Sequence, residues 1–447
     1  MMTLSPNSNI AVIGLGRVGR MITQYLLHKQ AKVIAYDDNK NIFNIKELKI
    51  LMNNSSFKMQ TELSSKLNQK FAVTSPGLSE NSRVVQFLRH NRVKLIDEIE
   101  FTASTINRPI IAITGTNGKS TTTSLLGKIL QADGKDVFWG GNLAPGIPFA
   151  VALFQQIKEY YVIEVSSFQL ERADEIHPHI AILTNITADH LDRHTSLNEY
   201  QRIKFKLFTN QNNNDYAIIN RDDPISMKYH KLIKSQRNFF SRFKKVKGAY
   251  INNNNIFYND EKICPVDKVR LFGSHYIDSV LAAVCASKII GVRNRIIADV
   301  LNNFTGLEHR LELVREYQGV KYINNSMCTN PTAGAAILGS FRQPVILIAG
   351  GKEKNLEIHD YIAAIIQKSK FTILIGENRT RLSNLLLSKQ YKSYELANSP
   401  EKAVMIAKEH ALPQDIILFS PGFASFDIFS NFQERGFAFK DIVYGIK

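Results

Sequence analysis

The sequence has few of the features that mark secreted or membrane proteins. Its 447 residues include only three cysteines, which stand far apart and without metal-ligand spacing: Cys264, Cys285 and Cys328. Such a set argues against a disulfide framework and fits a reducing compartment. No apolar run approaches the roughly 20 residues that span a bilayer, and the start MMTLSPNSN lacks the regions of a signal peptide. We therefore predict a cytoplasmic protein.

Acidic residues are scarce relative to basic ones. The chain has 56 Lys and Arg against 40 Asp and Glu, a formal net charge of +16. Such a balance is compatible with nucleic-acid binding or with polyanionic small substrates. The basic residues are scattered, without a dense run or interleaved aromatics. We therefore favour a compositional bias, with anionic substrates as a second contributor, and expect neither a nucleic-acid partner nor membrane insertion.

The chain is too long for one ordinary core, so two or three domains are expected. Short β-branched runs alternate with helix-like stretches, which is typical of parallel α/β domains. Boundaries at Asn107 to Pro109 and at residues 306–310 predict domains 1–107, 108–306 and 307–447. A polar segment, 252–260, predicts a surface hairpin in the middle domain. Strands are predicted at residues 10–13, 32–36, 71–74, 93–96, 110–114, 161–165, 180–184, 216–220, 321–324, 345–349, 371–375 and 415–420.

The clearest motif is a glycine-rich loop between a predicted strand and a helix-like segment. It consists of Gly115, Thr116, Asn117, Gly118, Lys119, Ser120 and Thr121. Glycine lets backbone N–H groups turn inward around phosphate oxygens, and the following helix N-terminus adds partial positive charge. Lys119 would reach the β- and γ-phosphates, and Ser120 or Thr121 would ligate Mg²⁺. Ile113 replaces the first glycine of the usual pattern, so this is a variant loop that predicts ATP binding.

A second glycine motif follows the first predicted strand. Gly14, Gly16 and Gly19 match G-x-G-x-x-G, and Asp37 and Asp38 end the next strand at the distance expected of a ribose-binding acid. Alone, the motif predicts a dinucleotide. The glycines could instead serve only close strand–helix packing, and the diphosphate of any nucleotide would suit the loop. A tight turn that begins at Ser75 would close over the same crevice.

Carboxylates and imidazoles follow two central strands. Glu164 lies at the end of one strand, and residues 185–194 contain Asp189, His190, Asp192, Arg193 and His194, with Lys204 on a probable helix beyond them. The carboxyl ends of strands are where α/β sheets place ligands. Each residue alone is more often part of a surface ion pair. Together, after a phosphate loop, they favour a site for Mg²⁺ and phosphate chemistry.

The order of these motifs resembles the Mur ligase family over nearly the whole chain. The matching segments are TGTNGKST at 114–121, GGN at 140–142, EVSSFQL at 164–170, NITADHLDRH at 185–194, Lys204, GLEHR at 306–310 and SPGFASFD at 420–427. The family activates a substrate carboxylate with ATP and joins it to an amino acid. The SSFQL and SPGFASFD segments look most like the members that add D-glutamate to UDP-N-acetylmuramoyl-L-alanine in peptidoglycan synthesis, and hence serve cell shape and division.

The resemblance implies a monomer with a Rossmann-like N-terminal domain for the UDP moiety, a central P-loop ATP-binding domain and a C-terminal Rossmann-like domain for the amino acid. Its catalytic residues would be Lys119, His190 and Lys204. ATP would contact residues 115–121 with His275, Arg310 and Asn325. Two Mg²⁺ ions would be held by Ser120, Glu164, His190 and a carbamylated Lys204. The UDP-linked substrate would contact Gly14, Gly16, Arg17, Val18, Asp37, Ser75, Asn142, Ser166 and Gln169. The amino acid would contact Thr329, Lys354, Ser425 and Phe432.

Several positions depart from the family pattern. Asn325 and Met327 stand where an aspartate and a lysine are usual, and Tyr276 and Ser279 replace two asparagines. Val18 replaces a frequent threonine, and Ala144 a glycine. The changes at Asn325 and Met327 keep open a degenerate ligase that binds nucleotide without turnover. Another Mur or folylpolyglutamate-type ligase is a second alternative, and the net charge of +16 keeps open an ATPase that acts on nucleic acid.

Overall fold

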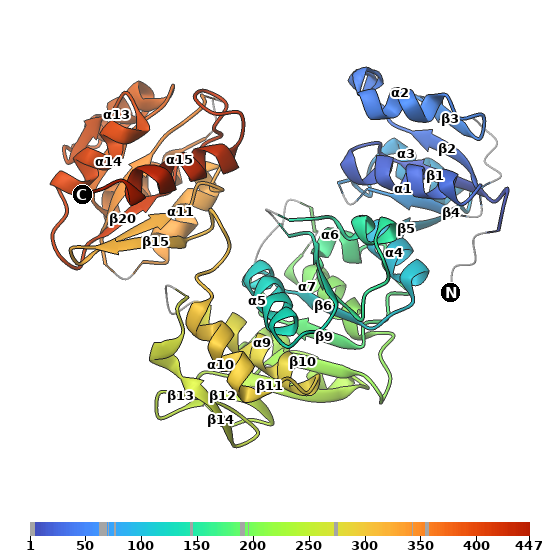
Figure 1. Ribbon diagram of the computed structural model, residues 1–447. Coiled ribbons are helices and arrows are strands. Elements are labelled where there is room, and N and C mark those ends of the chain that lie inside the picture. The colour runs from blue at the N-terminus through green and yellow to red at the C-terminus, as the bar shows by residue number, and fades with distance from the viewer. Residues whose placement is uncertain are drawn as a thin grey trace. The chain divides into compact units, whose positions relative to one another are not determined.

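The computed structural model describes residues 5–61, 69, 71–75, 77–143, 146–187, 193–194, 196–271, 276–341, 343–353 and 357–447. The chain divides into two compact units, one made of Met1–Val269 and Tyr276–Asn303, the other of Arg270–His275 and Phe304–Lys447. In the described part of the chain, the first unit contains two sheets and the second unit one (Figure 1). Helices alternate with mainly parallel strands over most of the chain, which confirms the predicted α/β class. The domain boundaries near 107 and 306 stay predictions.

The first sheet has the strand order β3-β2-β1-β4-β5, and its neighbouring strands are parallel. Along β1, Ile10 and Val12 enter one apolar cluster while Ala11 and Ile13 enter another. Both faces of the strand are therefore covered, which is why it reads as an unbroken apolar run. The strands are β1 (Asn9–Ile13), β2 (Lys32–Tyr36), β3 (Phe57–Gln60), β4 (Phe71–Thr74) and β5 (Lys94–Asp97). The helices are α1 (Arg17–His28), α2 (Lys46–Met52), α3 (Arg83–His90) and α4 (Glu98–Ile106), with the 3₁₀ helix η1 (Lys40–Asn44).

The second sheet has the order β14-β13-β12-β11-β10-β9-β6-β8-β7. It is parallel except for the pairs β12–β13 and β13–β14. Its strands are β6 (Ile110–Thr114), β7 (Val137–Gly141), β8 (Tyr160–Glu164), β9 (Ile180–Leu183), β10 (Tyr216–Asn220), β11 (Gln236–Ser241), β12 (Gly248–Asn252), β13 (Asn255–Tyr258) and β14 (Glu261–Pro265). Its helices are α5 (Lys119–Ala132), α6 (Ser167–Leu170), α7 (Leu197–Phe205), α8 (Pro224–Lys228), α9 (Ile277–Ile289) and α10 (Asn294–Asn303), with 3₁₀ helices η2 (Phe149–Phe154), η3 (Lys206–Phe208), η4 (His230–Leu232) and η5 (Val266–Lys268).

The predicted hairpin in the middle of the chain is confirmed. Strands β12 and β13 are joined by Asn253 and Asn254, whose φ angles are 45° and 56°. Positive φ at both central residues is the geometry of the turn that suits the twist of a two-residue hairpin, and asparagine tolerates it better than most residues. The antiparallel strands β12 to β14 therefore form the edge of the sheet farthest from β6 and β8.

The second unit is built on a sheet with the order β15-β16-β20-β17-β18-β19, parallel except for β15–β16. Ile346 and Ile348 of β17 pack with Val404 of α14 and Phe439 of α15 in one core. The strands are β15 (Glu312–Tyr317), β16 (Val320–Asn324), β17 (Val345–Ala349), β18 (Ser369–Leu374), β19 (Tyr394–Leu396) and β20 (Ile416–Phe419). The helices are α11 (Pro331–Gly339), α12 (His359–Lys368), α13 (Arg379–Ser388), α14 (Pro400–Glu409) and α15 (Phe432–Tyr444).

Within the first unit, buried carboxyl groups join the first sheet to residues that follow β8. The backbone N–H of Asp97 donates to the carbonyl oxygen of Arg172 at 2.8 Å. Nε2 of Gln169 donates to Oε1 of Glu98 at 3.3 Å. Burial raises the pKa of Glu98 to about 7 and that of Asp97 well above its usual range. Glu98 therefore changes its charge near neutral pH.

The raised pKa of Glu98 predicts that Glu98→Gln increases the free energy of unfolding in a pH-dependent way. The folded state holds the Glu98 proton more tightly than the unfolded state, so its stabilising effect is complete below the ordinary pKa of 4.5 and is lost as pH rises through about 7. Glutamine keeps the shape and cannot ionise. We expect the variant to gain on the order of 1–3 kcal/mol over the parent at pH 8 and little at pH 5. Thermal unfolding across this pH range measures the difference, with exposed Glu47→Gln as the control. A gain that does not change with pH would contradict the assignment.

Candidate functional site

The glycine-rich loop connects β6 to α5 and has little room for side chains. Gly115 and Gly118 have φ angles of 144° and 84°. A Cβ on Gly115 would lie 1.9 Å from Oγ1 of Thr184, and one on Gly118 would lie 2.8 Å from Oγ of Ser279. Both the conformation and the close neighbours therefore require glycine at these two positions.

Residues just after β9 form hydrogen bonds with the glycine-rich loop. Asn117 N–H donates to Oδ1 of Asn185 at 2.9 Å, and Oγ1 of Thr184 donates to the Asn117 carbonyl at 2.6 Å. Thr187 N–H donates to Oγ1 of Thr116 at 3.0 Å. The loop is thus shaped by residues that the sequence places about 70 positions later.

Two lysines converge on one carbonyl of this loop. Nζ of Lys119 donates to the carbonyls of Gly115 and Thr116 at 3.0 and 2.8 Å. Nζ of Lys204, on α7, donates to the same Gly115 carbonyl at 2.8 Å and lies 4.5 Å from the centre of the Tyr200 ring. The Lys204 side chain is 1% exposed. Two cations around one oxygen repel each other, so an anion between them, or loss of charge on one, would stabilise the arrangement.

Glu164 ends β8, next to β6 in the sheet, with its Cα paired to that of Ile113. Its Oε1 accepts a hydrogen bond from Nδ2 of Asn142 at 3.2 Å. Its Oε2 is buried and has no partner among the described residues. A buried, unsatisfied carboxylate oxygen close to a phosphate loop suits a divalent cation, which prefers oxygen ligands.

Ser166 and Gln169 form hydrogen bonds with each other at the start of α6. Ser166 N–H and Oγ both donate to Oε1 of Gln169 at 3.0 Å, and Gln169 N–H donates to Oγ of Ser166 at 3.3 Å. This reciprocal pair is a capping box, which fixes the first turn of the helix. The contact of these two residues with a substrate stays a prediction.

The amino-terminal glycine loop shows the packing role that its pattern allowed. A Cβ on Gly19 would lie 1.8 Å from the carbonyl oxygen of Gly14, whereas one on Gly16 would meet nothing within 4 Å. Asp37 accepts from Leu15 N–H at 2.6 Å, so its carboxylate holds the loop itself. Ser75 lies beside Gly14, because a Cβ there would be 3.0 Å from that of Ser75. The carboxyl ends of β1, β2 and β4 thus bring these predicted residues together. Arg17 and Val18 form the first turn of α1.

In the second unit, Asn325 is bonded inside the fold. Its Oδ1 accepts from Leu311 N–H at 3.2 Å, and its Nδ2 donates to Oγ of Ser420 at 3.0 Å. Met327 N–H donates to the carbonyl of His309 at 3.1 Å. Asn325 therefore ties the segment after Arg310 to the end of β20, and its predicted contact with ATP is untested.

Ser425 and Phe432 lie on the segment that leads into α15. The carbonyl of Ser425 accepts from Phe429 N–H at 2.8 Å, and the Phe432 ring lies 6.3 Å from that of His309. Sequence reasoning missed Arg435, which donates to the Phe423 carbonyl at 2.9 Å and to both oxygens of Ser326. Burial lowers the pKa of Arg435 to about 10. An arginine on an otherwise apolar helix face is the signal that would have singled it out.

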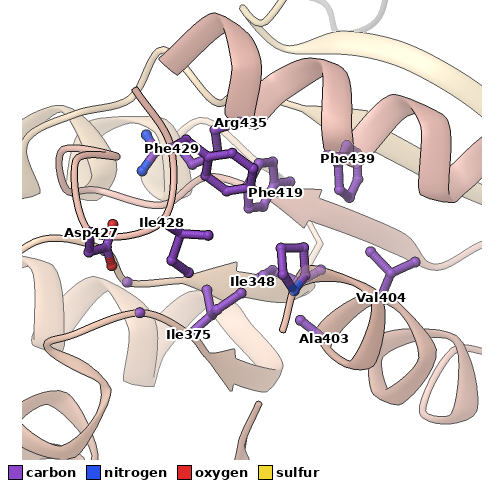
Figure 2. Close-up of a pocket in the computed structure, with 14 residues that line it drawn as sticks. Ile348, Ile375, Ala403, Val404, Phe419, Asp427, Ile428, Phe429, Arg435 and Phe439 are labelled. Carbon is purple, nitrogen blue, oxygen red and sulfur yellow. The ribbon is translucent and has the colours of Figure 1, made fainter. Parts of the chain in front are cut away.

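A cavity lies beneath this segment, at the carboxyl ends of β17, β18 and β20 (Figure 2). The charged ends of Asp427 and Arg435 lie on one side of it, and Val404 and Phe439 lie on the other (Figure 2). It offers only about 20 Å³ to the centre of a water molecule, which is room for about one. It is therefore too small for an amino acid.

Several predicted residues fall outside the part of the chain that the structure describes: His190, His275 and Lys354, with Ala144, Asp189 and Asp192. Thr329 is partly exposed just before α11. Among the residues that are described, no group of three or more His, Cys, Asp or Glu side chains is arranged to hold a metal ion. The metal site therefore stays a prediction that Glu164 supports.

The β6–loop–α5 unit in a mainly parallel sheet defines the class of P-loop α/β proteins. Comparison with known proteins narrows this class. The Mur ligase middle domain matches residues 113–287, and the Mur ligase glutamate ligase domain matches residues 309–423. The UDP-N-acetylmuramoylalanine--D-glutamate ligase of Thermoanaerobacter pseudethanolicus is 37% identical, covering 97% of each chain. That of Pelotomaculum thermopropionicum is 35% identical, covering 98% of each chain. The chain belongs to the Mur ligase family.

Solved structures agree on the fold. MurF ligase from Thermotoga maritima, determined in complex with ADP, aligns with a TM-score of 0.57 at 15% identity, covering 98% of this chain and 96% of that one. UDP-N-acetylmuramate-alanine ligase MurC from the same organism aligns with a TM-score of 0.55 at 15% identity, covering 98% and 100%. Across the described residues, the helices are too short or too polar to cross a membrane. The cytoplasmic location stays a prediction.

Gly16, which precedes α1, and Gly19, which lies within it, predict different outcomes for the same substitution. Gly19→Ala places a methyl group 1.8 Å from a backbone oxygen, whereas Gly16→Ala places it in open space at a negative φ. We expect Gly19→Ala to lower the free energy of unfolding by about 1–3 kcal/mol and Gly16→Ala to leave it nearly unchanged. Thermal or urea unfolding measures both. Equal effects would show that packing against Gly14 does not explain Gly19.

Proposed function

We propose that this chain forms an amide bond between D-glutamate and UDP-N-acetylmuramoyl-L-alanine at the expense of ATP, as part of peptidoglycan precursor synthesis. Relatives named UDP-N-acetylmuramoylalanine--D-glutamate ligase match the chain over nearly its whole length. The observation that carries the chemistry is the convergence of Lys119 and Lys204 on the Gly115 carbonyl. The orphaned oxygen of Glu164 lies at the end of a strand next to β6.

In the proposed reaction, the substrate carboxylate attacks the γ-phosphorus of ATP and forms an acyl phosphate with release of ADP. The amine of D-glutamate then attacks the acyl carbon, and phosphate leaves with the bonding electrons as the amide forms. Both steps bring anions together, so cations must neutralise them. Lys119 would bind the ATP phosphates, because its ammonium is already held at the loop.

Mg²⁺ would neutralise phosphate charge and orient the transferred group. Ser120, the second residue of α5, and Glu164 would hold ions, together with His190. We propose that Lys204 is carbamylated, which turns a buried cation into an anion able to orient a second ion. The change would also remove the repulsion between Lys204 and Lys119.

The remaining predicted residues divide by region. We propose that residues 1–107 hold the UDP moiety through the loop of Gly14, Gly16, Arg17 and Val18, with Asp37 and Ser75. Residues 108–306 would bind ATP, with Asn142, Ser166 and Gln169 toward the muramoyl part. Residues 307–447 would bind D-glutamate through Thr329, Lys354, Ser425 and Phe432. His275, Arg310 and Asn325 would be further contacts of ATP.

A second candidate is a ligase homologue that binds nucleotide without turnover. Asn325 and Met327, which lack the charges usual at these positions, favour it. The buried contacts of Asn325 weigh against it, because its side-chain oxygen and nitrogen each make a hydrogen bond inside the fold. Another Mur ligase activity is disfavoured, because the relatives at 33–37% identity share the D-glutamate ligase name.

Phosphate release distinguishes these functions. We expect purified protein with ATP, Mg²⁺ and UDP-N-acetylmuramoyl-L-alanine to release phosphate when D-glutamate is added, and not with L-glutamate, L-alanine, glycine or L-lysine. Release with another amino acid would assign a different family activity. ATP binding without release under any condition would establish the non-catalytic alternative.

Replacing Lys204 tests its proposed carbamate. Lys204→Ala should reduce turnover by about 10²-fold or more, because a charged group at the phosphoryl site is lost. Added formate or acetate should restore part of the activity, since a small carboxylate can occupy the vacated space. Lys228→Ala, which removes an exposed lysine at the end of α8, is the matched control. Turnover unchanged in Lys204→Ala would remove Lys204 from the mechanism.

A further inference from the structure

Two loops of the first unit, both predicted to contact the UDP-linked substrate, are joined by a set of polar contacts. One loop follows β4 and begins at Ser75. The other follows β8 and includes Ser166 and Gln169 at the start of α6. The contacts join segment 77–80 to segments 171–172 and 193–194. Among the residues that make them, only Arg193 and His194 stand in the cluster that the sequence predicts for Mg²⁺ and phosphate chemistry.

Arg193 makes the densest part of the junction. Its Nε and Nη2 donate to the two carboxylate oxygens of Glu171 at 3.0 and 2.7 Å. Nη2 also donates to the carbonyl of Leu78 at 2.8 Å, and Nη1 lies 3.5 Å from the carbonyl of Gly77. One guanidinium therefore binds the turn after β8 and the loop after β4 at the same time. A planar group with several fixed donors is needed for this geometry.

Arg172 repeats the contact from the other segment. Its Nη2 donates to the same Leu78 carbonyl at 2.9 Å, and its Nε donates to Oε1 of Glu80 at 2.9 Å. The Arg172 side chain is 2% exposed. The Leu78 carbonyl thus accepts from two guanidinium groups, and this loop position is set by charge-assisted bonds on both sides.

The guanidinium group of Arg193 also contacts an aromatic ring. The guanidinium carbon of Arg193 lies 4.4 Å from the centre of the Phe168 ring. His194, the next residue, has its Nε2 3.0 Å from Oγ of Ser167. Phe168 and Ser167 are the residues between Ser166 and Gln169, so Arg193 and His194 contact the same turn that carries two predicted substrate contacts.

We propose that Arg193 is a positioning residue for the UDP-linked substrate. By binding Glu171 and the Leu78 carbonyl together, it sets the spacing between the loop of Ser75 and the turn of Ser166 and Gln169. The proposal rests on the function proposed above, because it assigns that spacing to one substrate. It makes Arg193 important for the affinity of the UDP-linked substrate and unimportant for ATP.

Arg193→Lys is the informative substitution. Lysine keeps the charge and can reach one acceptor, but it cannot bind both Glu171 oxygens and the Leu78 carbonyl at once. Loss of a charge-assisted contact should raise KM for UDP-N-acetylmuramoyl-L-alanine by about tenfold. KM for ATP and kcat should stay within about twofold, because the spacing that Arg193 sets is assigned to the UDP-linked substrate alone. Phosphate release under steady-state conditions gives all three constants.

Two further variants separate positioning from general stability. Glu171→Gln keeps Arg193 but weakens its two-point anchor, so it should raise the same KM by a smaller factor. Lys206→Met removes a cation that bonds the carbonyl of Glu171 and the carboxylate of Asp174 without touching segment 77–80. It should leave both KM values unchanged. Two results for Arg193→Lys would overturn the proposal. One is a fall in kcat together with equal changes in both KM values, and the other is KM values equal to those of the parent.

The affinity for UDP-N-acetylmuramoyl-L-alanine, measured by calorimetry without ATP or amino acid, provides a readout independent of turnover. The whole substrate is the ligand, because the spacing lies between the loop of Ser75 and the turn assigned to the muramoyl part. Arg193→Lys should bind it about tenfold more weakly than the parent, and Lys206→Met should bind it equally well. If the parent enzyme binds this substrate but releases no phosphate with any amino acid, the proposed function fails while the calorimetric comparison still decides the role of Arg193. Equal affinity for the parent and Arg193→Lys would overturn the proposal even in an active enzyme.

Discussion

The carbonyl of Gly115 accepts hydrogen bonds from two lysines that belong to different helices, Lys119 on α5 and Lys204 on α7. This oxygen can gather both because Gly115 has a φ of 144° and leaves no space for a side chain. Lys204 is buried and Lys119 is partly exposed, so repulsion between their ammonium groups would favour an anion bound between them or a chemically modified lysine.

A second carbonyl organises the first unit in the same way. Leu78 accepts from Arg172 and Arg193, which reach it from segments on either side of β9. Lysine serves at Gly115, where each cation makes point contacts, and arginine serves at Leu78, where one group must bind several acceptors. The two carbonyls therefore gather cations differently: one accepts from two ammonium groups, and the other accepts from two guanidinium groups that join two loops.

Motifs whose chemistry depends on local sequence were predictable. The strand before each glycine loop, the helix after it and the hairpin at 252–260 were all confirmed, because apolar runs and turn residues encode them directly. Strands β3, β7, β11, β14, β15 and β19 were missed. Strand β7 ends in two glycines, and β19 is a short exposed edge. The use of Asp37 to hold its own loop, and the role of Arg193, depend on partners that sequence spacing does not show.

The substitutions at Asn325 and Met327 fit a ligase more easily when both are considered together than when each is considered alone. The usual residues are an acid and a base, so replacing both leaves the net charge of this region unchanged. Asn325 donates to Ser420 and accepts from Leu311 N–H, whereas a carboxylate in its place would accept from both, with the serine hydroxyl turned to donate. The backbone at the end of β16 is therefore compatible with either residue.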